Sequence, residues 1–268
     1  PPAGLEGVAE LLKALPPPDT PINQMADRIG RARSAFSELV PADAESRRWI
    51  AEMIAALDRG DAACRDLSDG LTQCAVRAEA RAFGMDFRSL YDTETRTFVI
   101  GYNLDSDRLD QHHYDLLASE ARLASYFAIA KRDVPVEHWF HLGRPIAKAV
   151  GALTTLSWNG SMFEYLMPAL LLPSDAGRLL GQSERAAVAA QRHYGDKLGR
   201  PWGVSESGYS ARDVSHRYQY QAFGVPGLGL KRGLSEDYVV APYASALAAV
   251  LAPAEATDRW EAWRETIA

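Results

Sequence analysis

The sequence predicts a mainly α fold, an α/α toroid preceded by a helical segment, and three observations lead to this prediction. Apolar residues recur at helical spacing through residues 5–83. From residue 110 onward, helix-like stretches alternate with loops rich in Trp, Gly, Ser, Tyr and Pro. Residues 87–102 alternate apolar and polar side chains, which predicts one small β-hairpin in a chain with few strands. With 268 residues, 47% of them hydrophobic, the chain has ample apolar side chains for a core.

The first 60 residues predict a helical linker that carries no candidate for chemistry. Apolar side chains between Leu5 and Leu15 repeat at helical spacing, and the prolines at 16–18 end that helix. Residues 22–57 continue as charged amphipathic helix, broken at Pro41. We therefore expect a linker over residues 1–60 and a main domain over residues 61–268.

The main domain begins with a long helix near residues 61–83, and the β-hairpin that follows turns at residues 92–95. Cys64 and Cys74 lie in the helical stretch without a metal-binding spacing, so we predict two buried thiols. Periodicity alone does not show how many helices the ring contains or whether the ring is closed. The further helices are expected near residues 113–131, 144–153, 161–172, 183–198 and 240–252.

Charge and motif content exclude several functions. A net charge of -6 without a basic cluster argues against a nucleic-acid surface. The six histidines form no HExxH or comparable ligand set, and the Gly-rich run 224–230 lacks the flanking strand and helix of a phosphate loop. The first residues lead into a charged segment rather than a signal peptide. The longest apolar run, residues 239–253, is shorter than the ~20 residues of a membrane span and predicts a buried helix.

Glu120 is the first candidate for acid/base chemistry. On a helical wheel, it falls near the middle of an apolar sector that includes Leu116, Leu123 and Phe127, with His113 on the same side. Burial there would disfavour the ionised carboxylate and raise the pKa of Glu120, as a proton donor requires. The alternative is a structural glutamate paired with an arginine of a neighbouring helix. The wheel places Arg122 on the opposite side, which makes it a poor partner.

Glu206 is the second candidate, and it lies in a loop rich in Ser and Gly. Loops positioned by a rigid scaffold often carry catalytic groups. Trp202 and Tyr209 flank Glu206, and their flat rings are of the kind that stack on the C–H faces of sugars. The alternative is a solvated loop glutamate.

Glu164 has a simpler expected role. Ser161 and Glu164 have the spacing of a helix capping box, and Trp158 precedes them beside a predicted turn. Trp158 therefore remains a candidate for the wall of a cleft. Lys231 and Arg232 beside Asp237 form either a cleft-edge ion pair or, as we prefer, a solvated turn.

Four strings together resemble a known family. They are YDLLASEARLASY at 114–126, MFEYLMP at 162–168, PWGVSES at 201–207 and YQYQAFGVPGLGLKRGL at 218–234. In this order they closely resemble the glycoamylase-like domain of bacterial cyclic β-1,2-glucan synthases. The resemblance covers about residues 61–253, and the preceding helices look like the segment that links this domain to the membrane-embedded glycosyltransferase of such a synthase.

The resemblance implies an (α/α)6 barrel that cuts linear β-1,2-glucan and rejoins its end to the same chain by anomer-retaining transglycosylation. It implies no metal or organic cofactor, other synthase domains as partners, and a cytoplasmic location at the inner membrane. The family's catalytic carboxylates fall on Glu120 and Glu206, and the two environments favour Glu120 as proton donor and Glu206 as nucleophile. Candidates for the sugar subsites are Tyr114, Asp115, His138, Trp139, Arg144, Trp158, Glu164, Trp202, Tyr209 and Arg232.

The chain departs from the family pattern after Pro253. The family continues through further barrel helices, whereas residues 258–264 match no motif of it. The expected barrel is therefore incomplete at its C-terminal end, and such a fragment is inactive, self-associating or completed by another chain. An endo-β-1,2-glucanase and a non-catalytic module that binds glucan or scaffolds the synthase are the alternative functions.

Overall fold

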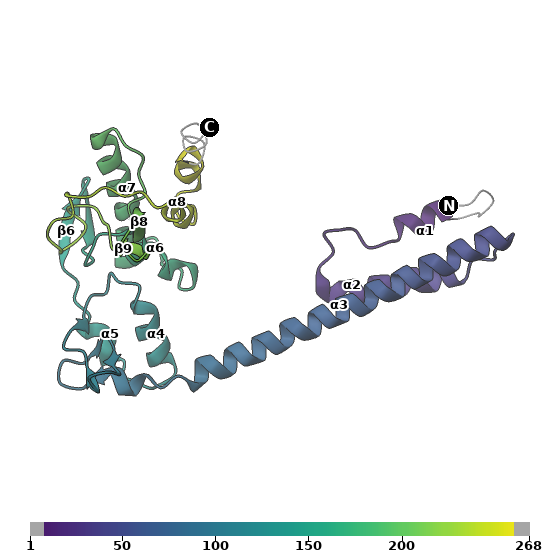
Figure 1. Cartoon of the computed structure of the whole chain (residues 1–268), viewed down its shortest axis with the longest axis horizontal. Coiled ribbons are helices and arrows are strands. Elements are labelled where there is room, and N and C mark those ends of the chain that lie inside the picture. The colour runs from purple at the N-terminus through teal and green to yellow at the C-terminus, as the bar shows by residue number, and fades with distance from the viewer. Residues whose placement is uncertain (1–7, 260–268) are drawn as a thin grey trace. The chain divides into compact units, whose positions relative to one another are not determined.

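The computed structural model describes residues 8–259 and divides the chain into two compact units, Pro1–Met85 and Asp86–Ala268 (Figure 1). Helices make up most of the regular structure, and the described strands form small sheets of two or three strands. The mainly α prediction is therefore confirmed. The boundary expected at residue 60/61 falls inside a continuous helix.

The first unit contains three helices, α1 (Val8–Lys13), α2 (Ile22–Ser37) and α3 (Ala44–Gly84). The predicted break at Pro41 lies between α2 and α3, and Asp43 caps α3 by accepting a hydrogen bond from the Ser46 amide at 2.7 Å. The two helices pack through a cluster centred on Phe36, Ile29 and Leu57. The first of the apolar residues that predicted α1, Leu5, lies outside the described residues.

The prediction of two buried thiols is wrong. Cys64 is half-buried and Cys74 is exposed on α3. Helical spacing identified the helix, but the buried residues of α3 lie at or before Leu57, and periodicity does not show where along a long helix the packing ends.

The second unit opens with η1 (Phe87–Leu90) and a three-stranded antiparallel sheet in the order β1-β2-β5. The predicted hairpin is confirmed as β1 (Tyr91–Asp92) and β2 (Thr97–Val99), and the Asp92 carboxylate accepts hydrogen bonds from the Glu94 amide and the Thr95 hydroxyl in its turn. A second hairpin, β3 (Tyr102–Asn103) and β4 (Arg108–Leu109), precedes β5 (His113–Tyr114). Helices α4 (Arg122–Ala130) and α5 (Glu137–His141) follow.

The rest of the second unit packs around its main core. The helices here are α6 (Met162–Leu166), η2 (Pro168–Leu170), α7 (Leu179–Leu198) and α8 (Pro242–Ala248), and residues 253–259 are also helical. The predicted helices at 161–172, 183–198 and 240–252 correspond to α6 with η2, to α7 and to α8. Two hairpins accompany them, β6 (Ile146–Ala149) with β7 (Ala152–Thr155) and β8 (Ser207–Arg212) with β9 (Tyr218–Gln221).

Two predictions for this unit are corrected. Residues 144–153 form most of the β6–β7 hairpin rather than a helix, so strands are more frequent than expected. In the stretch 113–131, the helix begins only at Arg122, because residues 113–117 bond to other segments: β5 pairs with β2, and the Leu117 amide donates to the Gly143 carbonyl at 2.9 Å. The apolar run 239–253 contains α8, whose Ala244 and Ala248 are buried. Among the described residues, no helix combines the length and apolarity that a membrane crossing requires.

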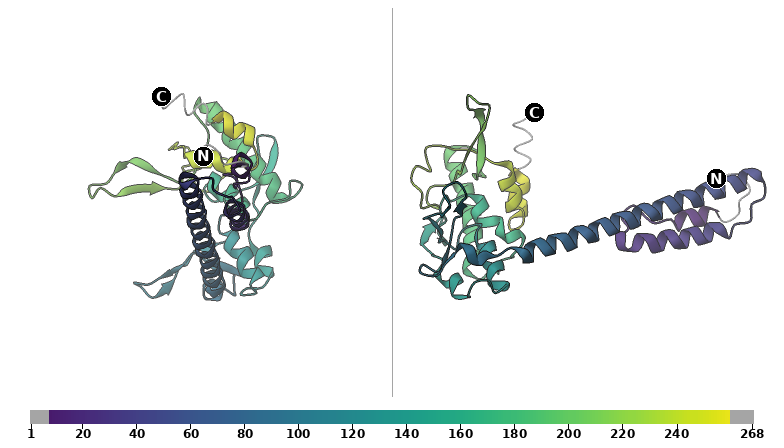
Figure 2. Two further views of the ribbon diagram at one scale, coloured as in Figure 1. Left: turned by 90° about the vertical axis from the view of Figure 1, so that its right-hand side faces the viewer. Right: turned by 60° about the horizontal axis from the view of Figure 1, so that its bottom comes forward.

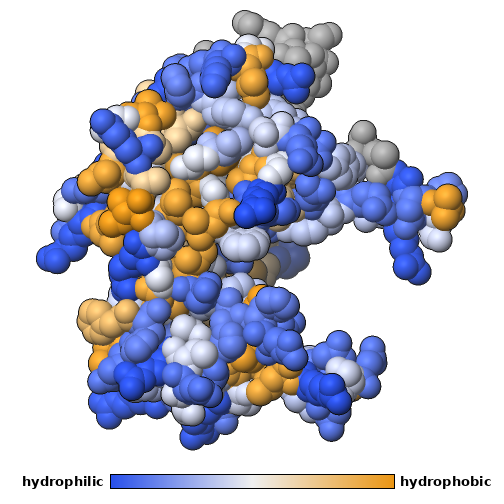
Figure 3. Space-filling view, turned by 90° about the vertical axis from the view of Figure 1, so that its left-hand side faces the viewer, coloured by the Kyte–Doolittle hydropathy of each residue, from blue (hydrophilic) through white to orange (hydrophobic). Residues whose placement is uncertain are grey.

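Hairpins β3–β4 and β8–β9 project from the same side of the second unit (Figure 2, left). Figure 3 shows them from the opposite direction, where they bound a hollow at the right-hand edge of a face on which apolar and polar side chains are mixed.

Candidate active site

A cavity of about 510 Å³ in the second unit brings both candidate catalytic carboxyls together. Its walls come from the segment before α4, the turn before α6 and the loop before β8. Glu120, Glu164 and Glu206 line it, with Tyr114, Asp115 and Trp158. Its volume lies within the usual range for small-molecule sites.

Glu120 lies in the turn directly before α4, half-buried in the cavity wall. The expectation that it occupies an apolar helix face is wrong, because α4 begins two residues later. The expected direction of its pKa shift nevertheless holds. Burial raises the pKa of Glu120, and the nearby charges of Glu164 and Glu206 raise it further.

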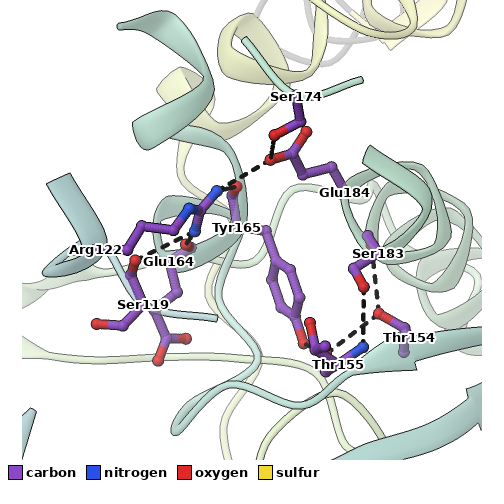
Figure 4. A network of polar contacts seen from close by, with 9 residues as sticks. All are labelled: Ser119, Arg122, Thr154, Thr155, Glu164, Tyr165, Ser174, Ser183 and Glu184. Carbon is purple, nitrogen blue, oxygen red and sulfur yellow. Dashed lines mark hydrogen bonds and ion pairs between the residues drawn. The ribbon is translucent and has the colours of Figure 1, made fainter. Parts of the chain in front are cut away.

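Arg122 bonds to Ser119, the residue directly before Glu120, and to residues of α6 and α7 (Figure 4), contacts that the helical wheel did not reveal. Its guanidinium is buried and donates to the carbonyls of Ser119, Glu164 and Tyr165 at 3.2, 2.8 and 2.8 Å. It also forms an ion pair at 3.0 Å with Glu184 of α7. One side chain thereby links the Glu120 turn to α6 and α7.

Glu164 is buried and fully engaged at the start of α6. Its carboxylate accepts hydrogen bonds from the amides of Trp158, Asn159 and Ser161 and from the hydroxyls of Ser157 and Ser161, at 2.9–3.0 Å. Together with the Ser161 side chain it forms the capping box, so that prediction is confirmed. Five hydrogen bonds therefore fix the position of this one carboxyl group.

Glu206 is held by two tyrosines from elements distant in sequence. The Tyr220 hydroxyl of β9 donates to its Oε2, and the Tyr243 hydroxyl of α8 donates to its backbone carbonyl at 2.7 Å. Partial desolvation of the Tyr220 hydroxyl and its bond to Glu206 raise the pKa of Tyr220, and burial raises that of Tyr243. Both hydroxyls therefore remain donors at neutral pH.

The loop that carries Glu206 is fixed at several points. The buried Gln191 of α7 donates to the Val204 carbonyl and accepts from the Val204 amide, both at 2.8 Å. The hydroxyl oxygen of Ser205 accepts from the Phe163 amide at 3.0 Å. Sequence reasoning identified Glu206 but missed Tyr220, Tyr243 and Gln191; only the alternation of Tyr218 and Tyr220 gave a local signal.

Six of the twelve predicted site residues line this cavity and six do not. Trp202 is 8% exposed and packs in the main core, and His138 is fully buried between the Arg96 carbonyl and the Ser125 hydroxyl. Neither offers a face to a sugar, so both expectations are corrected. The other four predicted residues outside the cavity are Trp139, Arg144, Tyr209 and Arg232.

Two of these four residues, Arg144 and Tyr209, make local hydrogen bonds. Arg144 donates to the carbonyls of Leu142 and Trp139, and Tyr209 donates to Asp237 at 2.8 Å. Arg232 is exposed beside a separate cavity of about 100 Å³. Within residues 8–259, no group of three His, Cys, Asp or Glu side chains is arranged to hold a metal ion.

Comparison with known proteins agrees with the resemblance in the motifs. The model of the family described as putative glucoamylase matches residues 112–266. A cyclic β-(1,2)-glucan synthase, NdvB of Rhizobium meliloti (strain 1021), is 45% identical over 228 residues, which is 82% of this chain and 8% of that protein. The chain thus spans less than a tenth of the length of this relative. The family match covers most of the second unit, and the chain belongs to this glycoamylase family.

Proposed function

We propose that this domain is a retaining transglycosylase of the glycoside hydrolase type that converts linear β-1,2-glucan into cyclic β-1,2-glucan. The observation that supports it most is the cavity in which Glu120 and Glu206 meet, each with a different environment. Similarity to a cyclic β-(1,2)-glucan synthase supports the choice of substrate.

The environments suggest the roles in the reaction. Glu206, with a tyrosine donor on one carboxylate oxygen, attacks the anomeric carbon as the nucleophile. Glu120, whose pKa is raised by burial and by neighbouring negative charge, gives its proton to the leaving glycosidic oxygen. The bond from carbon to that oxygen breaks as the ester bond to Glu206 forms. In the second step, the 2-hydroxyl at the other end of the same glucan attacks the anomeric carbon, the ester bond to Glu206 breaks and frees its carboxylate, and the hydroxyl proton goes to Glu120.

The architecture and setting belong to the same proposal. The second unit would form part of an (α/α)6 barrel, preceded by a helical linker that includes residues 1–60. The domain would act on the cytoplasmic side of the inner membrane, as part of a larger membrane-bound synthase. The relative's much greater length and the family match support this setting.

Incubation of the purified chain with linear β-1,2-glucan tests the function. We expect cyclic product, and Glu120→Gln and Glu206→Gln should each lower the rate by about 10²-fold or more. Glu94→Gln, in the exposed turn of the β1–β2 hairpin, is the matched control and should leave the rate unchanged.

Other products would change the assignment. Short linear glucans would indicate an endo-β-1,2-glucanase, and binding without turnover would indicate a glucan-binding module. Full activity in either glutamine variant would contradict the two-carboxylate mechanism. A product of inverted anomeric configuration would contradict the nucleophilic role of Glu206.

A further inference from the structure

The β8–β9 hairpin carries two exposed tyrosine rings beside Glu206. Tyr218 and Tyr220 of β9 are 67% and 61% exposed, although burying an aromatic ring is favourable. Side chains two residues apart on a strand point to the same face. Because the Tyr220 hydroxyl bonds to Glu206 in the cavity wall, this is the face of the hairpin that meets the cavity.

Gly208 gives independent support for this orientation. It pairs with Tyr220 across the hairpin, so a side chain at position 208 would lie on the same face. A Cβ atom built on Gly208 would lie 2.0 Å from Cε1 of Tyr218, which means that the Tyr218 ring covers the space that a side chain would need. The glycine therefore lets the Tyr218 ring lie against the hairpin on the face that carries Tyr220.

The position of the cavity indicates what this surface meets. Ile100 and Gln111, on either side of the β3–β4 hairpin, line the cavity, and so does Glu206, which directly precedes β8. Residues at the bases of both hairpins thus line the cavity. The two hairpins project to the same side of the second unit (Figure 2). A linear chain bound at the two carboxyls would leave the cavity past one or both hairpins.

We propose that Tyr218 forms a sugar-binding subsite just outside the cavity. Its ring, which packs against Gly208 next to Tyr220, stacks on a glucosyl ring. The proposal rests on the proposed function and adds a place for glucan beyond the bond that is cut. The subsite is specific for pyranose rings, since an aromatic face matches their C–H face. It makes the domain favour chains long enough to reach from the carboxyls to β9.

Kinetics and binding with the full chain test the subsite. The substrates are linear β-1,2-glucan and a short β-1,2-linked oligosaccharide, and Kd is measured in the Glu120→Gln background so that turnover does not interfere. Tyr218→Ala should raise KM and Kd for the long glucan roughly three- to tenfold and leave kcat nearly unchanged, because stacking is the same in the ground and transition states. The short oligosaccharide should respond less.

Two variants separate stacking from a structural effect. Tyr218→Phe keeps the ring and should retain the wild-type constants. Gln219→Ala, also exposed but on the opposite face of β9, is the matched control and should change neither constant. Equal effects of Tyr218→Ala and Gln219→Ala on KM and Kd would contradict the subsite. So would a Tyr218→Phe variant that binds glucan as weakly as Tyr218→Ala.

The subsite and the reaction can fail separately. Normal cyclisation together with an unchanged Kd in Tyr218→Ala would contradict the subsite but leave the proposed function supported. If the wild-type chain showed no turnover but Tyr218→Ala raised the Kd for glucan, the subsite would be supported and the proposed reaction contradicted. A wild-type chain that does not bind linear glucan would overturn both.

Discussion

Glu120 and Glu164 face one cavity but are held in opposite ways. Glu164 is surrounded by five donors, whereas the side-chain hydrogen bond of Glu120 comes from the adjacent Ser119 hydroxyl at 3.3 Å. The negative charge of Glu164 acts on the neighbouring Glu120 carboxyl and raises its pKa. The capping box therefore has a second effect: it fixes a negative charge that disfavours ionisation of Glu120.

Glu164→Gln should move the alkaline limb of the pH–rate profile to lower pH. The charge of Glu164 raises the pKa of Glu120, so an uncharged amide lowers that pKa, and Glu120 loses its proton at lower pH. Glu206 and Tyr114 also face the cavity and are unchanged in this variant. The measurement is kcat/KM against pH with linear β-1,2-glucan.

Ser161→Ala controls for damage to the helix cap. It removes a capping hydroxyl that bonds to Glu164 but leaves the charge in place. Its alkaline limb should stay at the wild-type position, even if stability falls by about 1 kcal/mol. An unmoved limb in Glu164→Gln would mean that Glu164 does not tune Glu120.

At the scale of elements, the sequence predicted the helices and the hairpin that are specified by neighbouring residues. The spacing of apolar residues identified α2, α3 and α7, and the turn chemistry around Asp92 identified the first hairpin. The segment before α4 reads as helix in composition, but its backbone bonds to Gly143 and to β2, which no local pattern encodes. Arg122 and Tyr220 were missed at the site for the same reason, because their partners lie far away in sequence.

The β6–β7 hairpin was missed because its turn has an unusual residue. Val150 and Gly151 both have positive φ, 46° and 84°, as a two-residue hairpin turn of type I′ requires. Asn-Gly is the usual signal for this turn, and a β-branched residue in the left-handed region is strained. With valine in place of asparagine, the sequence lacks the usual signal for this turn. The apolar stretch 144–153 therefore resembles a helix.

Val150→Asn should therefore stabilise the second unit. Asparagine tolerates the left-handed conformation, so the free energy of unfolding should rise by about 1 kcal/mol, measured by urea unfolding. Ile146→Asn replaces another exposed β-branched residue in β6, outside the turn, and should give no gain. Equal effects of the two substitutions would show that the turn is not strained.

At the scale of the whole chain, the two units have separate cores. The described cluster of the first unit joins residues between Leu11 and Cys64, and the clusters of the second unit join residues between Phe87 and Ala252. The candidate active site draws its residues from the second unit. A substitution in one core should therefore act mainly on the unit that contains it.

Phe36→Ala tests this independence. Phe36 is fully buried between α2 and α3, and removing its ring should cost the first unit about 3–5 kcal/mol. A unit of this size has a small free energy of unfolding, so the temperature of its thermal transition should fall sharply, or the transition should disappear. The transition of the second unit and the rate on β-1,2-glucan should stay near wild type. Met162→Ala, in the other core, should have the converse effect. If Phe36→Ala lowered both transitions and the rate together, the two units would fold as one cooperative body.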